Sequence, residues 1–228
     1  MLFPYEDPRW FHLMGSSLHP GGKPLSRRLL SLCAFPGGAK ILDFGCGPGA
    51  TLQLLRQEGA DALGVDCSES MLARASRHGP VLKGNLRAVP LEDDSLDGGI
   101  CECVLSQQSR PGEILREVRR LLKAECLFGM TDLFARTAPP SGGGSSSQFQ
   151  ETGDLHPCAQ GALPRKEMEE LFLQEGFELL HFEDHSRLLR EYAARLVWEG
   201  LLELSHGSCG GSPKGYGLWI WRKRREFS

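Results

Sequence analysis

Residues 40–50 constrain the fold of this chain more than any other stretch. The strand-like run KILDF leads directly into three glycines at alternating positions, GCGPG, and ATLQLL follows at helical spacing. Glycine adopts backbone conformations that other residues avoid, so it allows a sharp turn and a close approach to a ligand. A buried strand, a glycine-rich turn and a helix N-terminus together predict a cofactor-binding loop.

Strand and helix patterns alternate along most of the chain. Besides residues 40–44, apolar runs that predict strands lie at 62–66, 81–84, 99–105, 126–132, 177–183 and 215–221. Helical spacing between them predicts βαβ units, and therefore an α/β fold with a mostly parallel sheet and helices on both faces.

The remaining segments predict the organisation around that sheet. Residues 1–36 form an N-terminal arm and a helix, with Ser26 as its N-cap, and we expect them to act as a lid. Residues 37–228 form the main domain. It carries a flexible insertion at about 135–163, rich in Pro, Gly and Ser, and an extra amphipathic helix at about 187–205. The pattern leaves open whether the insertion covers an active site or is disordered.

Composition restricts the partners and the compartment. A net charge of -3 gives no basic field for nucleic acid or for an anionic membrane. No apolar run approaches the roughly 20 residues that span a bilayer, and the N-terminus lacks a secretory pattern, so a cytoplasmic location is expected. The chain has eight cysteines and no CxxC pair, so no metal site is expected. The oligomeric state stays open.

The glycine loop by itself is compatible with two cofactors. Gly45 to Ala50 satisfies the dinucleotide fingerprint, and Asp66 follows at the distance where an NAD enzyme keeps its ribose acid. Asp43, however, places a carboxylate just before the loop, which suits a cofactor that carries an ammonium group. Asp66 can also accept hydrogen bonds from a vicinal diol of either cofactor.

Four motifs together resemble the class I S-adenosylmethionine-dependent methyltransferases, with a methyltransferase type 11/25-like domain. They are DFGCGPG at 43–49, GVDCSESML at 64–72, LEDDSLD at 91–97, and REVRRLLK at 116–123 leading to Asp132. The resemblance is close over residues 38–134. It implies a Rossmann-like sheet of seven strands with the last strand antiparallel, in a three-layer α/β/α arrangement. It also implies S-adenosyl-L-methionine as cofactor and S-adenosyl-L-homocysteine as product.

The same resemblance implies a set of cofactor contacts. It places Gly45 and Gly47 against the methionine part of the cofactor, Asp66 on the ribose, and Cys67 and Met71 beside the adenine. Family members often have Asp where this chain has Asn85, whose carbonyl oxygen still accepts a hydrogen bond from the adenine amino group. The full expected set is Asp43, Gly45, Cys46, Gly47, Gly49, Asp66, Cys67, Met71, Asn85, Leu86 and Cys101.

The methyl acceptor is not encoded in these motifs. In this fold the end of the fourth strand faces the transferable methyl, and strand alternation places Cys101 and Cys103 on one face and Glu102 on the other. Two interpretations stay open: two small buried residues beside a partly exposed acid, or thiols at the mouth of the site. Thiols that meet Cys158 would bind a soft metalloid such as trivalent arsenic.

Two residues are candidates for a catalytic role, Cys103 and His185, the latter as a general base after the sixth strand. The leading hypothesis is a methyltransferase that acts on a small molecule of unknown identity. The alternatives are a metalloid or thiol methyltransferase that uses Cys101, Cys103 and Cys158, and a non-catalytic S-adenosylmethionine-binding protein. An NAD(P)-dependent oxidoreductase is a further alternative.

Overall fold

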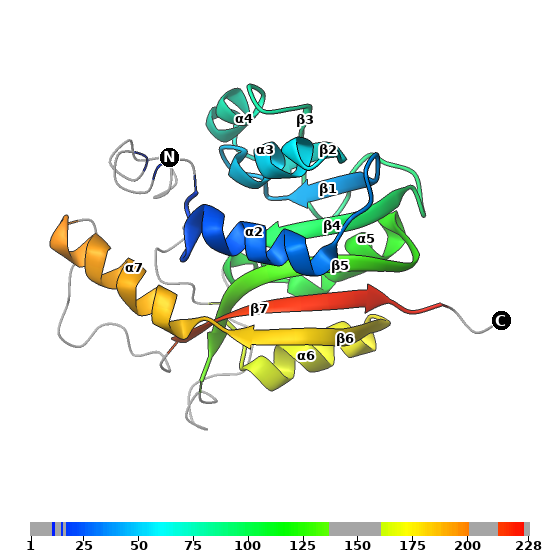
Figure 1. Cartoon of the computed structure of the whole chain (residues 1–228). Helices are drawn as coiled ribbons and strands as arrows, with labels where there is room; N and C mark the ends of the chain where they lie inside the picture. Colours follow the sequence, from blue (N-terminus) through cyan, green and yellow to red (C-terminus); the bar gives the residue numbers. More distant parts are fainter. Residues whose placement is uncertain (1–10, 12–14, 16, 137–160, 201–213, 226–228) are drawn as a thin grey trace.

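The structure is a computed structural model that describes residues 11, 15, 17–136, 161–200 and 214–225 (Figure 1). These residues form one seven-stranded sheet with the order β3-β2-β1-β4-β5-β7-β6. The strands are β1 (Lys40–Phe44), β2 (Asp61–Asp66), β3 (Val81–Lys83), β4 (Leu96–Glu102), β5 (Leu122–Ala135), β6 (Phe177–Asp184) and β7 (Lys214–Lys223). The helices are α2 (Gly22–Cys33), α3 (Ala50–Gln57), α4 (Glu69–Ala75), α5 (Pro111–Leu121), α6 (Arg165–Gln174), α7 (Ser186–Trp198) and the 3-10 helix η2 (Leu105–Gln107).

Strand directions confirm the predicted fold class. Strands β3, β2, β1, β4 and β5 pair in parallel. Strand β7 lies antiparallel to both β5 and β6. The carboxyl ends of the parallel strands β1, β2 and β4 therefore meet at one edge of the sheet, which is where open α/β sheets bind ligands.

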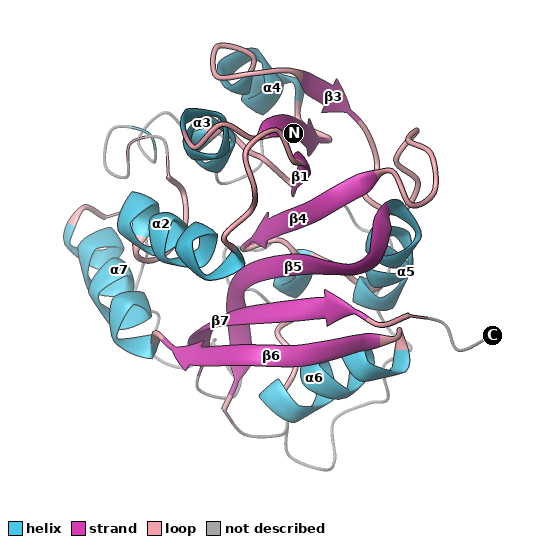
Figure 2. Ribbon diagram, turned by 45° about the vertical axis from the view of Figure 1, so that its right-hand side comes forward, coloured by secondary structure: helices cyan, strands magenta, loops and turns pink. Residues whose placement is uncertain are grey.

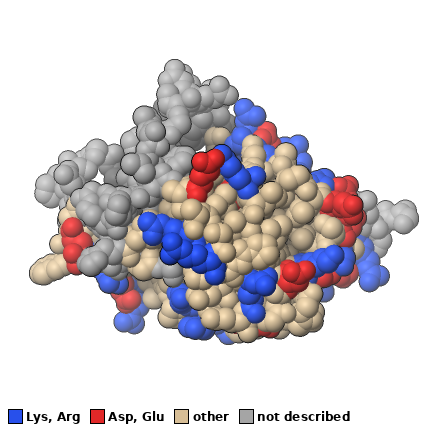
Figure 3. All heavy atoms as spheres, turned by 90° about the horizontal axis from the view of Figure 1, so that it is seen from above, with Lys and Arg blue, Asp and Glu red and all other residues tan. Residues whose placement is uncertain are grey.

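The sheet is covered on both faces (Figure 2). On one face, buried residues of α2 and α3 form a single apolar cluster with the sheet, and α7 packs against its margin. On the other face, α5 and α6 pack over a second cluster in which Phe172 stacks on Trp221 with a centroid distance of 4.2 Å. Acidic and basic side chains are interspersed on the face drawn in Figure 3.

The fourth strand begins and ends three residues earlier than predicted. We expected residues 99–105, whereas β4 covers Leu96–Glu102. The strand stops because Cys103 has a positive φ of 56°, and Leu105 already belongs to η2. Glu102 is therefore the last residue of β4, at the edge of the sheet where ligands bind.

Helix α2 also begins earlier than expected. The predicted N-cap, Ser26, lies inside α2 and is fully buried, and its hydroxyl donates to Glu102 at 3.0 Å. The apolar side of α2, with Leu25, Leu29 and Leu30, is buried against the sheet. A lid function for residues 1–36 stays a prediction.

The insertion falls mostly outside the described residues. Strand β5 continues to Ala135, α6 begins at Arg165, and residues 137–160 are not described. The predicted extra helix is present as α7, and its expected continuation to residue 205 also lies outside the described part. None of the described helices is both long and apolar enough to cross a membrane.

Candidate functional site

A cavity of about 610 Å³ lies at the carboxyl ends of β1, β2 and β4. Five stretches line it: residues 17–19, residues 43–51 without 44 and 49, residues 66–67, residues 83–86, and residues 102–108 without 105 and 106. Expected cofactor residues that line it are Asp43, Gly45, Cys46, Gly47, Asp66, Cys67, Asn85 and Leu86. The structure thus brings most of the expected set together around one space.

The glycine loop is held in place by β2. The backbone N–H of Gly45, at a φ of 73°, donates to Val65 O at 2.8 Å. The N–H of Gly47, at a φ of 51°, donates to Asp66 Oδ2 at 2.9 Å. A Cβ atom added at Gly47 would meet no atom within 4 Å, so this glycine faces open space on the cavity wall. Residue 47 therefore allows a ligand to approach the backbone closely.

Three expected residues do not line the cavity. Gly49 has a φ of 87°, and a Cβ there would lie 2.8 Å from the Cα of Ala75, so this glycine permits close packing of the loop on α4. Met71 and Cys101 are each only 1% exposed and do not line the cavity.

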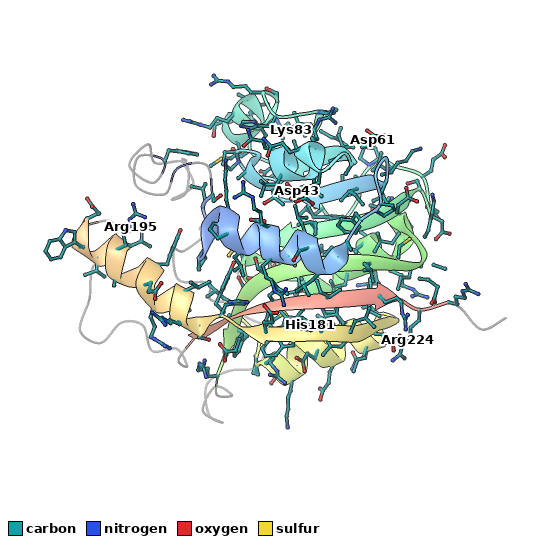
Figure 4. The ribbon with its side chains drawn as sticks, viewed as in Figure 1. Asp43, Asp61, Lys83, His181, Arg195 and Arg224 are labelled. Carbon is teal, nitrogen blue, oxygen red and sulfur yellow. The ribbon has the colours of Figure 1, made fainter. Side chains whose placement is uncertain are left out.

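Asp43 is a buried carboxylate without a full set of partners. It is 3% exposed, and its Oδ2 accepts no hydrogen bond. Burial raises the pKa of this carboxyl well above its usual value, and the nearby carboxylates Glu102 and Asp66 raise it further. Figure 4 labels Asp43, which lies on β1 in the interior of the fold. Since buried charges are normally paired, this oxygen fits a ligand ammonium group.

Asp66 ties the loop to the next helix. Its Oδ1 accepts from the N–H of Ser68 at 2.9 Å while Oδ2 accepts from Gly47. Farther along the cavity, Asn85 Oδ1 accepts from the Arg87 N–H at 3.0 Å. An amide oxygen has two lone pairs, so Asn85 Oδ1 keeps acceptor capacity for a ligand.

Glu102 is the cavity residue that the predicted strand alternation placed incorrectly. Instead of a partly exposed acid, it has a side chain that is only 6% exposed and that lines the cavity. It accepts hydrogen bonds from the hydroxyls of Ser26, Thr51 and Thr131, and His19 Nε2 lies 3.6 Å from its Oε1. Placing the end of β4 at Glu102 would have identified this residue, because acids at the carboxyl ends of parallel strands lie at the edge of the sheet where ligands bind.

Cys101 and Cys103 do not share one face of the strand, although strand alternation predicted that they would. Cys101 packs in the apolar cluster beneath α5, whereas Cys103 packs against the cluster on the opposite face and lines the cavity. They do not share a face because regular strand geometry ends before the positive φ of Cys103. Cys158, the third residue of the proposed thiol set, lies outside the described residues.

The Cys103 thiol belongs to a hydrogen-bonded chain. Its Sγ lies 3.1 Å from the Tyr216 hydroxyl, which donates to Thr131 Oγ1 at 2.9 Å. The single proton of Tyr216 is thereby used, so the Cys103 S–H is the donor to Tyr216. Burial, and after it Asp132, raises the pKa of this thiol well above its usual value. Cys103 is thus held as a thiol.

His185, the other catalytic candidate, does not line the cavity. It immediately precedes α7, and its Nε2 lies 2.8 Å from Glu183 Oε2. Glu183 also contacts His181 and accepts a hydrogen bond from Arg28. Figure 4 shows His181 on β6, well away from Asp43. Among the described residues, no group of three or more His, Cys, Asp or Glu is placed to hold a metal ion.

Several known methyltransferases are similar to this chain. The family model described as a methyltransferase domain matches residues 42–129. The ubiquinone biosynthesis O-methyltransferase of Bordetella avium is 33% identical over 94 residues, which are 38% of this chain and 39% of that protein. The arsenite methyltransferase of Aquipseudomonas alcaligenes is 27% identical over 195 residues, or 75% and 53% of the two chains. The first curated relatives are matched over only 28% to 39% of their own length.

Solved structures share the fold over nearly the whole chain. Phosphoethanolamine N-methyltransferase 2 of Haemonchus contortus, with phosphomonomethylethanolamine and S-adenosylhomocysteine, aligns with a TM-score of 0.74 and 17% identity, over 97% of this chain and 58% of that one. The [4+2]-cyclase SpnF aligns with a TM-score of 0.72 and 19% identity, over 99% and 98% of the two chains. Because the same fold serves a cyclase, the fold alone does not decide the reaction.

Proposed function

We propose that this chain, whose residues 42–129 match a methyltransferase domain, acts as a class I S-adenosylmethionine-dependent methyltransferase and transfers the methyl group of S-adenosylmethionine to a small-molecule acceptor. The observation that carries the proposal is the unpartnered Oδ2 of Asp43, a buried acceptor on the wall of the cavity. A nicotinamide cofactor would bring a pyrophosphate to this loop and repel the carboxylate. The amino acid part of S-adenosylmethionine carries an ammonium group that complements it.

The other residues of the wall fit the rest of that cofactor. The backbone of Gly45 and Gly47, which lines the cavity, accommodates the methionine chain, and the carboxylate of Asp66 accepts from the ribose hydroxyls. Asn85 offers its carbonyl oxygen to the adenine amino group, with Cys67 and Leu86 beside the ring. Each role rests on the placement of these residues around the cavity.

Bound S-adenosylmethionine would supply an electrophilic methyl carbon on a sulfonium. The residues of this chain would hold the acceptor in line with that carbon and exclude water from it. Such positioning alone provides a large part of the rate enhancement in bimolecular transfers. The roles that the proposal requires of the protein are therefore binding and orientation, together with an acceptor for any proton that leaves the nucleophile.

A thermal-shift series tests the cofactor. We expect S-adenosylhomocysteine to raise the melting temperature in a concentration-dependent way and NAD(H) to leave it unchanged. Methyl transfer is then followed with labelled S-adenosylmethionine against a panel of small amines, phenols, thiols and arsenite. Stabilisation by NAD(H) would favour an oxidoreductase. Stabilisation by S-adenosylhomocysteine without any labelled product would favour a non-catalytic binding protein.

A metalloid or thiol acceptor is the second candidate. It is favoured by the arsenite methyltransferase relative, which aligns with 75% of this chain. The geometry of the thiols favours it less, because Cys101 is buried in the apolar cluster and burial raises the pKa of the Cys103 thiol well above its usual value. Single Cys103→Ser and Cys158→Ser variants, titrated with arsenite, separate the two candidates. Arsenite binding that is lost in either variant would favour the metalloid.

A further inference from the structure

We propose that Glu102 is the acceptor-binding carboxylate and that the acceptor is an amine, positively charged or N–H-bearing at the reacting nitrogen. This inference rests on the proposed function and concerns the part of the cavity that the cofactor contacts leave unused. That part is formed by Glu102 and Cys103 at the end of β4, by Thr51 of α3, and by residues 17–19 before α2.

The charges on the described wall favour a cation. They comprise three carboxylates, Asp43, Asp66 and Glu102, and a single lysine, Lys83. The ammonium of Lys83 lies 2.5 Å from Glu69 Oε1, so it already has a carboxylate partner. Asp43 is matched by the cofactor ammonium and Asp66 by the ribose, which leaves Glu102 for the transfer point. An acceptor with a phosphate or carboxylate near its reacting atom would meet net repulsion there.

The surroundings of Glu102 leave its negative charge uncompensated by a fixed cation. Its three hydrogen-bond donors, Ser26, Thr51 and Thr131, are neutral hydroxyls. Among the described residues, no Lys or Arg forms an ion pair with it, and the nearest basic group is the His19 imidazole. Neutral donors fix the orientation of a buried carboxylate and solvate it, while its field remains available to a ligand.

His19 is placed to receive a proton through Glu102. Its Nδ1 lies 3.1 Å from the carbonyl of Pro20, which can only accept, so Nδ1 carries the hydrogen and neutral His19 has a bare Nε2. That Nε2 lies 3.2 Å from Ser26 Oγ and 3.6 Å from Glu102 Oε1. Ser26 directs its own proton to Glu102, so an N–H at Nε2 completes the network.

An ammonium acceptor must lose one proton before its nitrogen can attack the methyl carbon. An acceptor ammonium gives one proton to the Glu102 carboxylate, from which it can pass to His19 Nε2. The nitrogen lone pair forms the bond to the methyl carbon, and the carbon–sulfur bond breaks with its electron pair on sulfur. The products are the methylated ammonium, the neutral thioether S-adenosylhomocysteine and the proton on the Glu102–His19 pair, so the two positive charges of the reactants are conserved.

A probe that needs no known acceptor tests this inference. Sinefungin carries an amine where S-adenosylmethionine carries its methyl sulfonium, so its ammonium occupies the transfer point, whereas S-adenosylhomocysteine is uncharged there. We expect wild-type protein to bind sinefungin about tenfold more tightly than S-adenosylhomocysteine by calorimetry, the scale of one hydrogen bond to a charged group. Equal affinities, or weaker binding of sinefungin, would overturn the proposal without any variant having to fold.

The variant Glu102→Gln keeps the shape of the side chain and removes its charge. We expect it to lower the affinity for sinefungin about tenfold while that for S-adenosylhomocysteine changes less than about twofold. Equal losses for the two ligands would show that Glu102 only shapes the cavity. The matched control is Glu183→Gln, which neutralises a carboxylate near the end of β6 that does not line the cavity, and it should leave both affinities unchanged.

Failure of the proposed function would look different. If this chain does not use S-adenosylmethionine, the wild-type protein will bind neither S-adenosylhomocysteine nor sinefungin. If only the acceptor inference is wrong, both ligands will bind the wild-type protein, and the preference for sinefungin will be absent or will survive Glu102→Gln.

Discussion

The two halves of the cavity are built in different ways. The proposed cofactor half consists of Asp43, the glycine loop, Asp66 and Asn85, which lie within 43 to 85, at or just beyond the carboxyl ends of β1, β2 and β3. The acceptor half combines residues 17–19, Thr51 and Glu102 with supporting groups on β5 and β7. One half is a property of local strand–loop–helix units, and the other exists only because distant segments meet.

This difference explains why one half shows as a sequence motif. Glycine at a positive φ and an acid that bridges two backbone amides are demands of a local turn, so they recur at fixed spacing. Glu102 meets its partners from four separate segments, and no spacing rule relates Ser26 to Thr131. The comparison predicts that substitutions in the cofactor half abolish or weaken cofactor binding, whereas the acceptor half discriminates between ligands.

The largest effect is expected for Gly47→Val. Its side chain would project into open space on the cavity wall, at a φ of 51° that valine avoids. We expect loss of S-adenosylhomocysteine affinity by more than about 100-fold, or about 3 kcal/mol. The matched control is Gly59→Val, whose φ of 88° and open surroundings impose the same backbone strain outside the cavity. Normal affinity in Gly47→Val, measured by calorimetry, would show that the cofactor lies elsewhere.

Asp66→Ala should have the next largest effect. It removes the acceptor for the N–H groups of Gly47 and Ser68 together with the proposed ribose contact. We expect cofactor binding to weaken by about 1–3 kcal/mol, the range for hydrogen bonds to a charged group. Asp61→Ala, at the opposite end of β2 and outside the cavity, provides the control. If the two variants bind S-adenosylhomocysteine equally well, Asp66 has no contact with the ligand.

Asp43→Asn should separate stability from binding. Burial raises the pKa of this carboxyl, so the ionised form destabilises the ligand-free fold. Its contribution to stability is fully present below pH 4 and is lost as the pH rises through the raised pKa. At pH 7, Asp43→Asn should therefore stabilise the ligand-free protein by on the order of 1 kcal/mol while it weakens S-adenosylhomocysteine binding.

Urea unfolding at pH 4 and pH 7, with and without S-adenosylhomocysteine, measures both effects. The gain in stability from Asp43→Asn should shrink toward pH 4, because the wild-type carboxyl is protonated there and is uncharged like the amide. A variant that is less stable at pH 7, or one that binds the ligand as well as wild type, would contradict the role assigned to Asp43.

The smallest effect is expected for the cluster of Glu183, His185 and Arg28, which lies outside both halves. Arg28 above all holds the pKa of Glu183 down to about 2. The stabilisation is present above the ordinary carboxyl pKa of 4.5 and is lost as the pH falls toward 2. Because Arg28 is half exposed, Glu183→Gln should cost less than about 1 kcal/mol at pH 7. His185→Gln should leave ligand binding unchanged, and a loss of methyl transfer in it would bring His185 back as a general base.

Local patterning was enough to predict most of the fold. Helix α4 and the ends of β1 and β2 lie where their residues indicated, because capping, glycine and apolar periodicity act within a few residues. The end of β4 was misplaced by three positions. Nothing in the sequence shows that Cys103 adopts a positive φ, a conformation that is uncommon for any residue other than glycine.

The glycine loop, with Asp43 before it and Asp66 after it, was enough to predict from the sequence alone a methyltransferase domain and the residues that we propose for its cofactor. The reason is that close backbone approach and paired acceptors are short-range requirements. The tertiary structure alone decided that Glu102 faces the cavity, that Cys101 and Cys103 part to opposite sides of the sheet, and that His185 stays outside. Those placements depend on where β4 ends and on which segments pack against it, and such contacts join residues far apart in the chain.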